Sequence, residues 1–463
     1  MSFICVFSKQ NNPEFADETE LDTVDKARLE TLLCPYIGDV YRVDVVNSQL
    51  YVSSNADLYS VDKNRDVSAV CDIPRNTQKN PQTSWLEVTS TTNRLIFKTD
   101  PLGTFPLWVF DDEHRIVITS EVKSLLALVD SVKVELNHSE LEKQGKRPAN
   151  FSPYKNVRRV KPGATLEISD QGVLMESGDF PLVYHPASMF PSIEKSKEAL
   201  SAALTASSKT IGQKNGSWGA FLSGGIDSSS ATALLNRIHP GLQTYTLGTE
   251  FGDEYSDAAE LATYLNTPHT KVFAKSDEAM SHFERAVFCN ETVDGLTAET
   301  VAQLSVLSQS AVDNAEFIIT GYGADLLFGS MLRHELYMKV TGVDGLQSLI
   351  ERTCWSGEFS PFFAWSLGIE IHHLFWDPDV MNCAFRIPDE YNFDGEHEKV
   401  ALRTLAVEGE LMKQSHAFRK KHAMTDGTQF NRVLSNALAL DDNYSYDRKS
   451  DRCIALLTEI FNQ

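Results

Sequence analysis

The stretch FLSGGIDSSS, Phe221 to Ser230, places a Ser-Gly-Gly turn between an apolar strand and the start of a helix. Two adjacent glycines let the backbone approach a ligand closely and adopt positive φ. The helix that follows offers unpaired N–H groups and the positive end of its dipole, which together favour a bound phosphate. Asp227, expected at a solvent-facing strand end, would then hold a magnesium ion on that phosphate. An ordinary corner, with Asp227 or Ser228 capping the helix, is the alternative.

The chain around this turn has the pattern of a parallel sheet. From about Ser192, short apolar runs alternate with helical patterns, which is typical of strands covered by helices on both faces. The predicted strands are Trp218–Leu222, Thr244–Leu247, Lys271–Phe273 and Phe317–Thr320, and the predicted helices include Ser228–Ile238 and Ser256–Tyr264. Ligands of such sheets bind at the carboxyl ends of the strands. The segments Phe221–Ser230 and Thr320–Asp325 are therefore expected to contribute to one site.

The part of the chain before about residue 190 is β-rich. Short alternating runs are separated by clusters of Asn, Asp, Pro and Gly, and they include residues 40–46, 49–52, 94–98 and 165–169. A chain of 463 residues is too long for one typical core. We therefore predict two domains: residues 1–190, an α+β domain built on a β sandwich, and residues 191–463, an α/β domain with a parallel sheet. The last 100 or so residues are predicted to be mainly helical.

The composition excludes several classes of protein. A net charge of −22 disfavours a general binder of nucleic acid or anionic membranes, since both need a basic surface. No apolar run approaches the roughly 20 residues of a membrane span, and the N-terminus lacks the features of a signal peptide. The seven cysteines are dispersed without metal-binding spacing, as expected of reduced thiols. We predict a cytoplasmic protein with no nucleic-acid or membrane partner, and a homodimer is compatible with the sequence.

The turn at residues 223–228 is similar to one known nucleotide loop. It contains neither the Walker P-loop pattern nor G-x-G-x-x-G, but its S-G-G-x-D-S resembles the pyrophosphate loop of the ATP pyrophosphatase family. Members of that family cleave ATP to AMP and pyrophosphate while they activate a carboxylate or carbonyl. The resemblance implies that ATP is bound, with pyrophosphate cradled by Ser223, Gly224, Gly225 and Ser228. It also implies that backbone groups of Leu222 and Leu247 pair with adenine.

The N-terminal part resembles another family. Residues 99–108, TDPLGTFPLW, and 119–126, TSEVKSLL, look like conserved stretches of class II glutaminase domains, as found in asparagine synthetase B. That resemblance implies an Ntn-hydrolase-like fold. Glutaminases of this class begin with a nucleophilic cysteine, but here Cys5 is internal, and removal of Met1 would expose Ser2 instead. The family's glutamine-binding motifs are not evident, so we expect a scaffold without glutaminase activity.

A second motif, GYGAD at residues 321–325, distinguishes between relatives. Asparagine synthetases carry G-E-G-S-D-E here, whereas this chain has Tyr322 in place of the glutamate, which resembles the β-lactam synthetases, including carbapenam synthetase. Residues 356–361, 372–377 and 419–427 are similar to further segments of that family. The chain departs from the asparagine synthetase pattern at Leu326 and Leu327, directly after the aspartate.

The resemblance implies a role for each residue of the motifs. Asp227 and Asp325 are hard oxygen ligands suited to Mg²⁺, and Gly321 joins the nucleotide-binding set. Tyr322 would take the proton of the substrate amine, with Glu358 as its orienting partner. Lys421 would stabilise the oxyanion of the tetrahedral intermediate. Each also has an ordinary interpretation, as a packed aromatic, a solvated acid or a surface cation.

Together these features predict an ATP-dependent, AMP-forming amide ligase that uses Mg²⁺ and closes an intramolecular amide. Among such amides, the motifs favour a β-lactam ring. The substrate would be a small β-amino-acid-type molecule, whose identity the motifs leave open. One alternative is an asparagine-synthetase-like ligase that makes asparagine, or a peptide macrolactam with a leader-peptide partner. Another is a pseudoenzyme that binds nucleotide, for which loss of Asp227 or Asp325 would be the expected signature.

Overall fold

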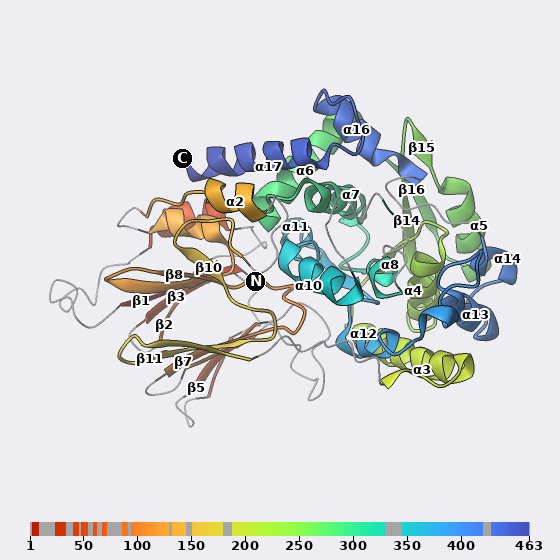
Figure 1. The fold of residues 1–463 in the computed structure, drawn as a ribbon, viewed down its shortest axis with the longest axis horizontal. Helices are drawn as coiled ribbons and strands as arrows, with labels where there is room; N and C mark the ends of the chain where they lie inside the picture. The colour runs from red at the N-terminus through yellow and green to blue at the C-terminus, as the bar shows by residue number, and fades with distance from the viewer. Residues whose placement is uncertain are drawn as a thin grey trace.

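Figure 1 shows the computed structural model of the chain, with a β-rich part at one end and an α/β part at the other. The residues that the structure describes are 2–8, 24–33, 40–45, 48–53, 59–62, 67–71, 86–90, 94–128, 132–144, 151–178, 188–328, 335, 345–419 and 427–462.

The described strands of the N-terminal part form two antiparallel sheets. The first has the order β10-β8-β9-β1-β3-β2 and the second the order β12-β11-β7-β6-β5-β4. Their bounds are β1 Ser2–Ser8, β2 Val40–Val45, β3 Ser48–Ser53, β4 Tyr59–Asp62, β5 Val67–Cys71, β6 Leu86–Ser90, β7 Arg94–Thr99, β8 Trp108–Asp111, β9 Arg115–Thr119, β10 Val157–Arg159, β11 Thr165–Ser169 and β12 Leu174–Ser177. The two sheets form separate layers in Figure 1. In the described residues of this part, three short helical elements accompany them: α1 Lys26–Leu32, η1 Val122–Ala127 and α2 His138–Gln144.

The alternation predicted from the sequence explains how these sheets pack. Along β7, Leu95, Phe97 and Thr99 are buried while the residues between them are more exposed, because successive side chains of a strand point to opposite faces. Phe3 on β1 stacks on Phe97, with ring centroids 6.1 Å apart, and so joins the first sheet to the second. The strands predicted at residues 40–46, 49–52, 94–98 and 165–169 are present as β2, β3, β7 and β11.

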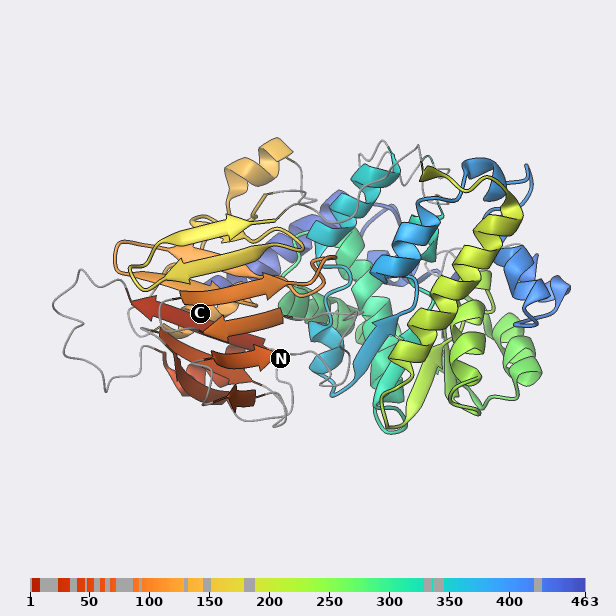
Figure 2. The ribbon, with the colours of Figure 1, turned by 90° about the horizontal axis from the view of Figure 1, so that it is seen from below.

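The C-terminal part contains the predicted parallel sheet, visible in Figure 2 beside the N-terminal sheets. Its strands are β13 Trp218–Phe221, β14 Gln243–Thr249, β16 His269–Phe273, β17 Phe317–Thr320 and β18 Glu370–His373, with a short antiparallel β15 at Gly252–Asp253. Strand β18 was not predicted. All the other pairings between these strands are parallel.

Both faces of this sheet are covered, as the alternation of strands and helices predicts. Phe221, Tyr245 and Ile318 join the core cluster that includes α6 (Ser276–Asn290) and α7 (Gly295–Ala311). Their neighbours Ala220, Leu222 and Ile319 join the cluster on the side of α3, α4 and α5. Those helices span Ile193–Ile211, Ile226–Asn236 and Tyr255–Leu265. The remaining elements in the described part of the chain are α8 Ala324–Leu327, α10 Leu346–Ser356, α11 Phe362–Trp365, α12 Pro378–Ala384, η4 Asp389–Tyr391, α13 Val400–Glu408, α14 Gln414–Ala417, α16 Phe430–Ala437 and α17 Tyr446–Phe461.

The two parts share packed contacts. Helix α17 runs back over the N-terminal part (Figure 1), where Phe461 meets Tyr154 edge to face at 5.5 Å. Phe105, between β7 and β8, packs edge to face on Phe362 of α11 at 5.6 Å. The mixed α/β architecture with several sheets is therefore confirmed, while the Ntn-type assignment and the division at residue 190 stay predictions.

Two further findings bear on the predictions from composition. In the part of the chain that the structure describes, no helix is long and apolar enough to cross a membrane. The cysteines whose side chains are described are buried thiols that form no disulfide, and they are Cys5, Cys289, Cys354, Cys383 and Cys453.

Candidate active site

The two motif-bearing strand ends lie against each other. Strands β13 and β17 pair in parallel, so the loops that follow them leave the same edge of the sheet. Gly321 makes this approach so close that a Cβ atom there would overlap the backbone of Asp227 and Ser228. The glycine of the second motif is thus required by its contact with the first, and the structure brings together the two segments that the sequence assigned to one site.

The loop at residues 223–228 is shaped by its own polar groups. Gly224 has φ +78°, and a side chain at this position would collide with Asp257 at the start of α5. Gly225 has φ −76°, so only one of the two glycines uses the left-handed region. The Ser228 hydroxyl accepts from the backbone N–H of Ser223 at 3.0 Å and lies 3.0 Å from the Ser223 hydroxyl. The turn is preorganised, and α4 begins directly behind it with its N–H groups and positive dipole end.

Helix α4 starts at Ile226, two residues earlier than predicted, and this changes the position of Asp227. The carboxylate lies in the first turn of the helix and is only 5% exposed. The expectation that Asp227 faces solvent is therefore wrong, because the helix begins at Ile226, directly after its N-cap Gly225, and turns Asp227 inward. Asp325, with a side chain 35% exposed, is the more accessible of the two carboxylates.

A lysine that sequence analysis missed lies between these two carboxylates. Lys399 Nζ donates to Asp227 Oδ2 at 2.7 Å and also pairs with Asp325 Oδ1. Its side chain is 1% exposed, and its backbone has φ +59°, which a residue other than glycine seldom adopts. Lys399 precedes α13 and lies 74 residues beyond Asp325, so no local pattern marked it.

The donor set fits a magnesium ion that is held largely by its substrate. Lys399 already supplies positive charge between the carboxylates, and the described residues contain no cluster of three His, Cys, Asp or Glu side chains able to hold a metal. Mg²⁺ commonly takes one or two protein carboxylates and completes its shell with phosphate oxygens and water. Asp325, at the open side of the site, suits that arrangement better than the buried Asp227.

The backbone groups assigned to adenine are only partly available. The N–H of Leu222 donates to Tyr245 O at 2.8 Å, and its carbonyl accepts from the Thr246 hydroxyl. The Leu222 carbonyl keeps a second lone pair for a ligand. Leu247, on the neighbouring strand, is buried with 2% exposure.

Tyr322 and Glu358 are in contact, although 36 residues separate them. The Tyr322 hydroxyl donates to Glu358 Oε1. The phenol ring stacks on Phe359 with centroids 4.8 Å apart and meets His373 at 5.8 Å. Glu358 is 6% exposed, and burial raises the pKa of its carboxyl, while the nearby Arg352 opposes that effect. A buried acid hydrogen-bonded to a phenol can accept a proton through it.

The loop that carries Glu358 is fixed at several points. Helix α10 ends at Ser356, and Gly357 closes it with φ +74°, the left-handed conformation usual after a helix. The N–H of Glu358 donates to the Ser356 hydroxyl at 3.1 Å. The side-chain amide of Asn290, the last residue of α6, donates to Gly357 O at 3.0 Å and to Ser360 O at 3.3 Å.

Lys421 lies outside the described residues, so the structure does not test its position. The segment that leads to it ends at Arg419, which pairs with Asp257 at 2.9 Å and with Glu260 at 2.5 Å. Asp257 is the residue that packs against Gly224 of the phosphate loop. The guanidinium of Arg419 therefore lies close to that loop.

The N-terminal motif residues that the structure describes stabilise loops and contacts. Asp100 accepts the backbone N–H groups of Leu102, Thr104 and Phe105 at 2.8–3.1 Å and so folds the turn of residues 100–105. Burial raises the pKa of Asp100 to about 6. Cys5 is buried in β1, and the side chain of Ser2 is not among those described. These positions leave the expected absence of glutaminase activity as a prediction.

Comparison with known proteins agrees with this site. Residues 199–350 match the asparagine synthase family, a segment that includes both the phosphate loop and GYGAD. The chain contains an asparagine synthase domain. It is 25% identical over 390 residues to the carboxyethyl-arginine β-lactam synthase of Streptomyces clavuligerus, which covers 81% of this chain and 70% of that protein. These features fit a β-lactam synthetase-like member of the family and indicate a ligase.

Other relatives are asparagine synthetases, of which the chain spans about half or less. It is 24% identical to a putative glutamine-hydrolysing asparagine synthetase of Methanocaldococcus jannaschii, over 63% of this chain and 53% of that protein. It is also 24% identical to a glutamine-hydrolysing asparagine synthetase of Lotus japonicus, over 46% of this chain and 40% of that protein. Among solved structures, an NMN synthetase from Francisella tularensis aligns over 58% of this chain and 95% of that one, at 13% identity and a TM-score of 0.27.

Proposed function

We propose that the protein is an ATP-dependent, AMP-forming ligase that adenylates a substrate carboxylate and then closes an intramolecular amide, preferably a β-lactam ring. The proposal rests on one observation above the others. Beside the phosphate loop, where asparagine synthetases have a glutamate, Tyr322 donates a hydrogen bond to the buried Glu358. A phenol–carboxylate pair can take the proton from a substrate amine.

Adenylation comes first, because a free carboxylate has no adequate leaving group. The substrate carboxylate attacks the α-phosphorus of ATP, the bond to the β-phosphate oxygen breaks, and pyrophosphate leaves. The N–H groups of the loop and of the first turn of α4 receive its negative charge, with Lys399 between Asp227 and Asp325 as the nearby cation. Mg²⁺, held by Asp325 and phosphate oxygens, would neutralise further charge on the phosphates.

Ring closure follows at Tyr322. The substrate amine attacks its own acyl carbon while Tyr322 takes the amine proton, supported by Glu358. The tetrahedral oxyanion collapses to the amide, and AMP departs with the pair of electrons from the broken acyl–phosphate bond. We assign Lys421 to stabilisation of the oxyanion, as the family resemblance implies.

The remaining assignments belong to the same proposal. The substrate is a small β-amino-acid-type molecule, the N-terminal part does not hydrolyse glutamine, and the protein acts in the cytoplasm without a nucleic-acid or membrane partner. An asparagine or macrolactam ligase is the second candidate, and the asparagine synthetase relatives favour it. Tyr322 in place of the family glutamate argues against asparagine formation. Retention of both Asp227 and Asp325, joined by Lys399, argues against a pseudoenzyme.

ATP–pyrophosphate exchange tests the proposal. The purified protein is supplied with ATP, Mg²⁺ and labelled pyrophosphate in the presence of single β-amino acids with a terminal carboxylate. We expect exchange that depends on one class of acid, and a product that has lost the mass of one water. Exchange followed by ammonia-dependent amide formation, without cyclisation, would support the asparagine-type ligase. Failure of exchange with every acid would indicate the pseudoenzyme.

A further inference from the structure

We propose that Arg352 is a positioning residue for Glu358, that Asp294 holds Arg352 in turn, and that the N-terminal part secures the two segments that carry this relay. The proposal rests on the proposed function, because it gives the Tyr322–Glu358 pair its role in amine deprotonation.

The relay is a buried series of contacts between three charged side chains. Arg352 Nη1 lies 3.4 Å from Glu358 Oε2, and Arg352 Nη2 lies 2.5 Å from Asp294 Oδ2. The side chains of Arg352 and Asp294 are 4% and 1% exposed. Asp294 also begins α7, where its carboxylate accepts the Leu296 N–H at 3.0 Å and the Thr297 hydroxyl at 3.1 Å. One guanidinium therefore bridges Glu358 and a helix cap, in a place that water does not reach.

The arrangement gives Glu358 both a charge state and an orientation. Burial raises the pKa of Glu358, Arg352 and the Tyr322 hydroxyl lower it, and Asp294 raises it. Without a cation, a carboxyl group in this position would be neutral and could not accept a proton. The rigid guanidinium fork also fixes the plane of the carboxylate that it binds.

The other groups packed around the pair do not replace this cation. His373 on β18 contacts the rings of Tyr322 and Phe359, and burial lowers the pKa of His373 to about 3, so its ring is neutral. Among the described residues, the charged groups that act on Glu358 are thus Arg352 from α10 and Asp294 from the start of α7.

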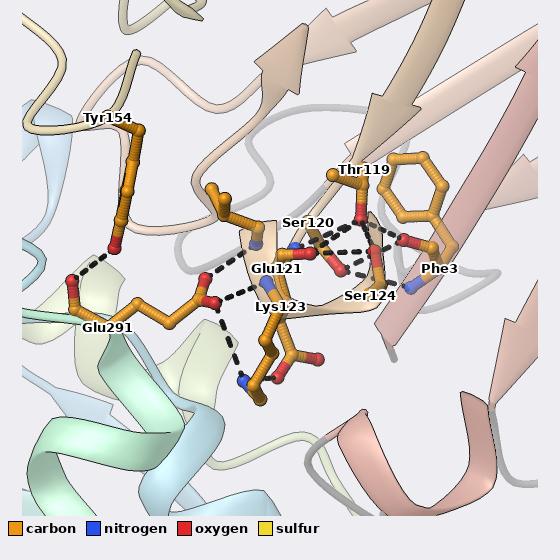
Figure 3. A network of polar contacts seen from close by, with 9 residues as sticks. Phe3, Thr119, Ser120, Glu121, Lys123, Ser124, Tyr154 and Glu291 are labelled. Atoms are coloured by element: carbon orange, nitrogen blue, oxygen red, sulfur yellow. Dashed lines mark hydrogen bonds and ion pairs between the residues drawn. The ribbon is translucent and has the colours of Figure 1, made fainter. Parts of the chain in front are cut away.

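The N-terminal part secures the turn that carries Asp294. Glu291 lies three residues before Asp294, and its carboxylate accepts the backbone N–H groups of Val122 and Lys123 in η1 at 2.7 and 2.6 Å (Figure 3). The Tyr154 hydroxyl donates to the carbonyl of Glu291 at 2.9 Å. These contacts come from two separate segments of the N-terminal part and converge on one residue.

The same part secures the end of α10, the helix that carries Arg352. Arg159 of β10 donates to the carbonyls of Cys354 and Trp355 at 3.1 and 2.5 Å. Carbonyls in the last turn of a helix lack partners within the helix, so this cation satisfies them. The guanidinium of Arg159 also lies over the rings of Trp108 and Trp355. In this proposal, the task of the N-terminal part is to frame the Arg352–Glu358 contact.

The first test compares adenylation with ligation over a range of pH. Arg352→Gln should keep acid-dependent pyrophosphate exchange, while ligation at neutral pH falls about 10²-fold because the acid is no longer held in place. The acidic limb of the pH–rate profile of ligation should move to higher pH, because Arg352 lowers the pKa of Glu358 and this effect is lost. Arg352→Lys should restore the position of that limb and only part of the rate. Asp294→Asn, which keeps a good helix cap, should move the limb to lower pH because it removes the charge that opposes ionisation.

Arg452→Gln is the matched control, since Arg452 on α17 also lies between two acids, Glu284 at 3.0 Å and Glu459 at 3.8 Å, but away from Glu358. It should leave both activities and the profile unchanged. If Arg352→Gln and Asp294→Asn lower ligation without opposite shifts of the acidic limb, the relay as proposed is wrong.

A second measurement needs no substrate and so separates this proposal from the proposed function. The Tyr322 ring carbon bearing the hydroxyl is observed by ¹³C NMR after labelling of tyrosine, and Tyr322→Phe identifies its signal. Arg352→Gln should shift that signal and Arg452→Gln should not. No shift in a folded Arg352→Gln protein would overturn the relay even if ligation fails for other reasons. Failure of exchange with every acid, together with the expected shift, would refute the proposed function and leave the relay standing.

The framing by the N-terminal part is tested by a double-mutant cycle. Glu291→Gln and Arg352→Gln should be non-additive in their effect on ligation, because both act on the position of Glu358. Additive effects would overturn the link between the N-terminal part and the relay.

Discussion

Removal of the Tyr322 hydroxyl should separate the two chemical steps. Tyr322→Phe retains the ring, and with it the stacking on Phe359 and the edge contact with His373. It deletes only the group that donates to Glu358 and that would take the amine proton. In the proposed mechanism, adenylation depends on the loop at residues 223–228 and on Lys399, and the described hydrogen bonds of these residues do not involve the Tyr322 hydroxyl.

The expected magnitudes favour a folded but slow enzyme. Glu358 is 6% exposed, so loss of its donor leaves one oxygen without that partner, at a cost of about 1–3 kcal/mol in stability. Arg352 still contacts the other oxygen and limits the cost. A domain of ordinary stability, about 5–15 kcal/mol, stays folded. Loss of a general base, in contrast, lowers the ligation rate by roughly 10²–10⁴.

The assay measures acid-dependent pyrophosphate exchange and cyclised product in the same preparations of wild type, Tyr322→Phe and Glu358→Gln. We expect exchange near the wild-type level in both variants. The cyclised product should fall by roughly 10²–10⁴ in Tyr322→Phe and by a smaller factor in Glu358→Gln. Cyclisation at the wild-type rate in Tyr322→Phe would refute the reasoning, since the tyrosine would then be structural. An equal fall in exchange and cyclisation would assign Tyr322 to substrate positioning instead of proton transfer.

Three further predictions concern the other parts of the molecule. Asp325→Asn should reduce Mg²⁺-dependent exchange about 10²-fold or more, because Asp325 is the carboxylate proposed to hold the ion, while the protein stays folded because Lys399 keeps its contact with Asp227; near-normal exchange at saturating Mg²⁺ would contradict this. Glutamine should yield no glutamate, and Ser2→Ala and Cys5→Ala should leave ligation unchanged; glutamate release abolished by either change would show an active glutaminase. Burial raises the pKa of Glu291 from 4.5 to about 7. Between these two pH values the acid is mostly protonated in the folded protein and mostly ionised in the unfolded chain. The stability that this protonated group contributes is fully present below about pH 4.5 and is lost as the pH rises through 7. The free energy of unfolding should fall by about 3 kcal/mol at most over this range. Thermal unfolding at pH 5 and pH 8 should therefore differ less in Glu291→Gln than in wild type.

Local sequence patterns predicted much of this protein. Apolar runs of period two identified strands β2, β3, β7 and β11. In β7 and β11, whose side chains are described, buried residues alternate with more exposed ones. The Ser-Gly-Gly turn and GYGAD predicted adjacent loops, since parallel strands end at the same edge of a sheet. The family resemblance paired Tyr322 with Glu358, and these residues are in contact. Strand β18 was missed because Glu370-Ile-His-His is short and carries three polar side chains.

The sequence by itself determined many of the strands and helices and the place of the Ser-Gly-Gly turn, because those depend on residues close together in the chain. The tertiary structure alone decided that Lys399 bridges Asp227 and Asp325, and that Asp294 and Arg352 reach Glu358. Nothing near Lys399 or Arg352 in the sequence distinguishes either from a surface cation. Lys399 meets Asp227 and Asp325, and Arg352 meets Asp294, only because packing brings together elements 58 to 172 residues apart.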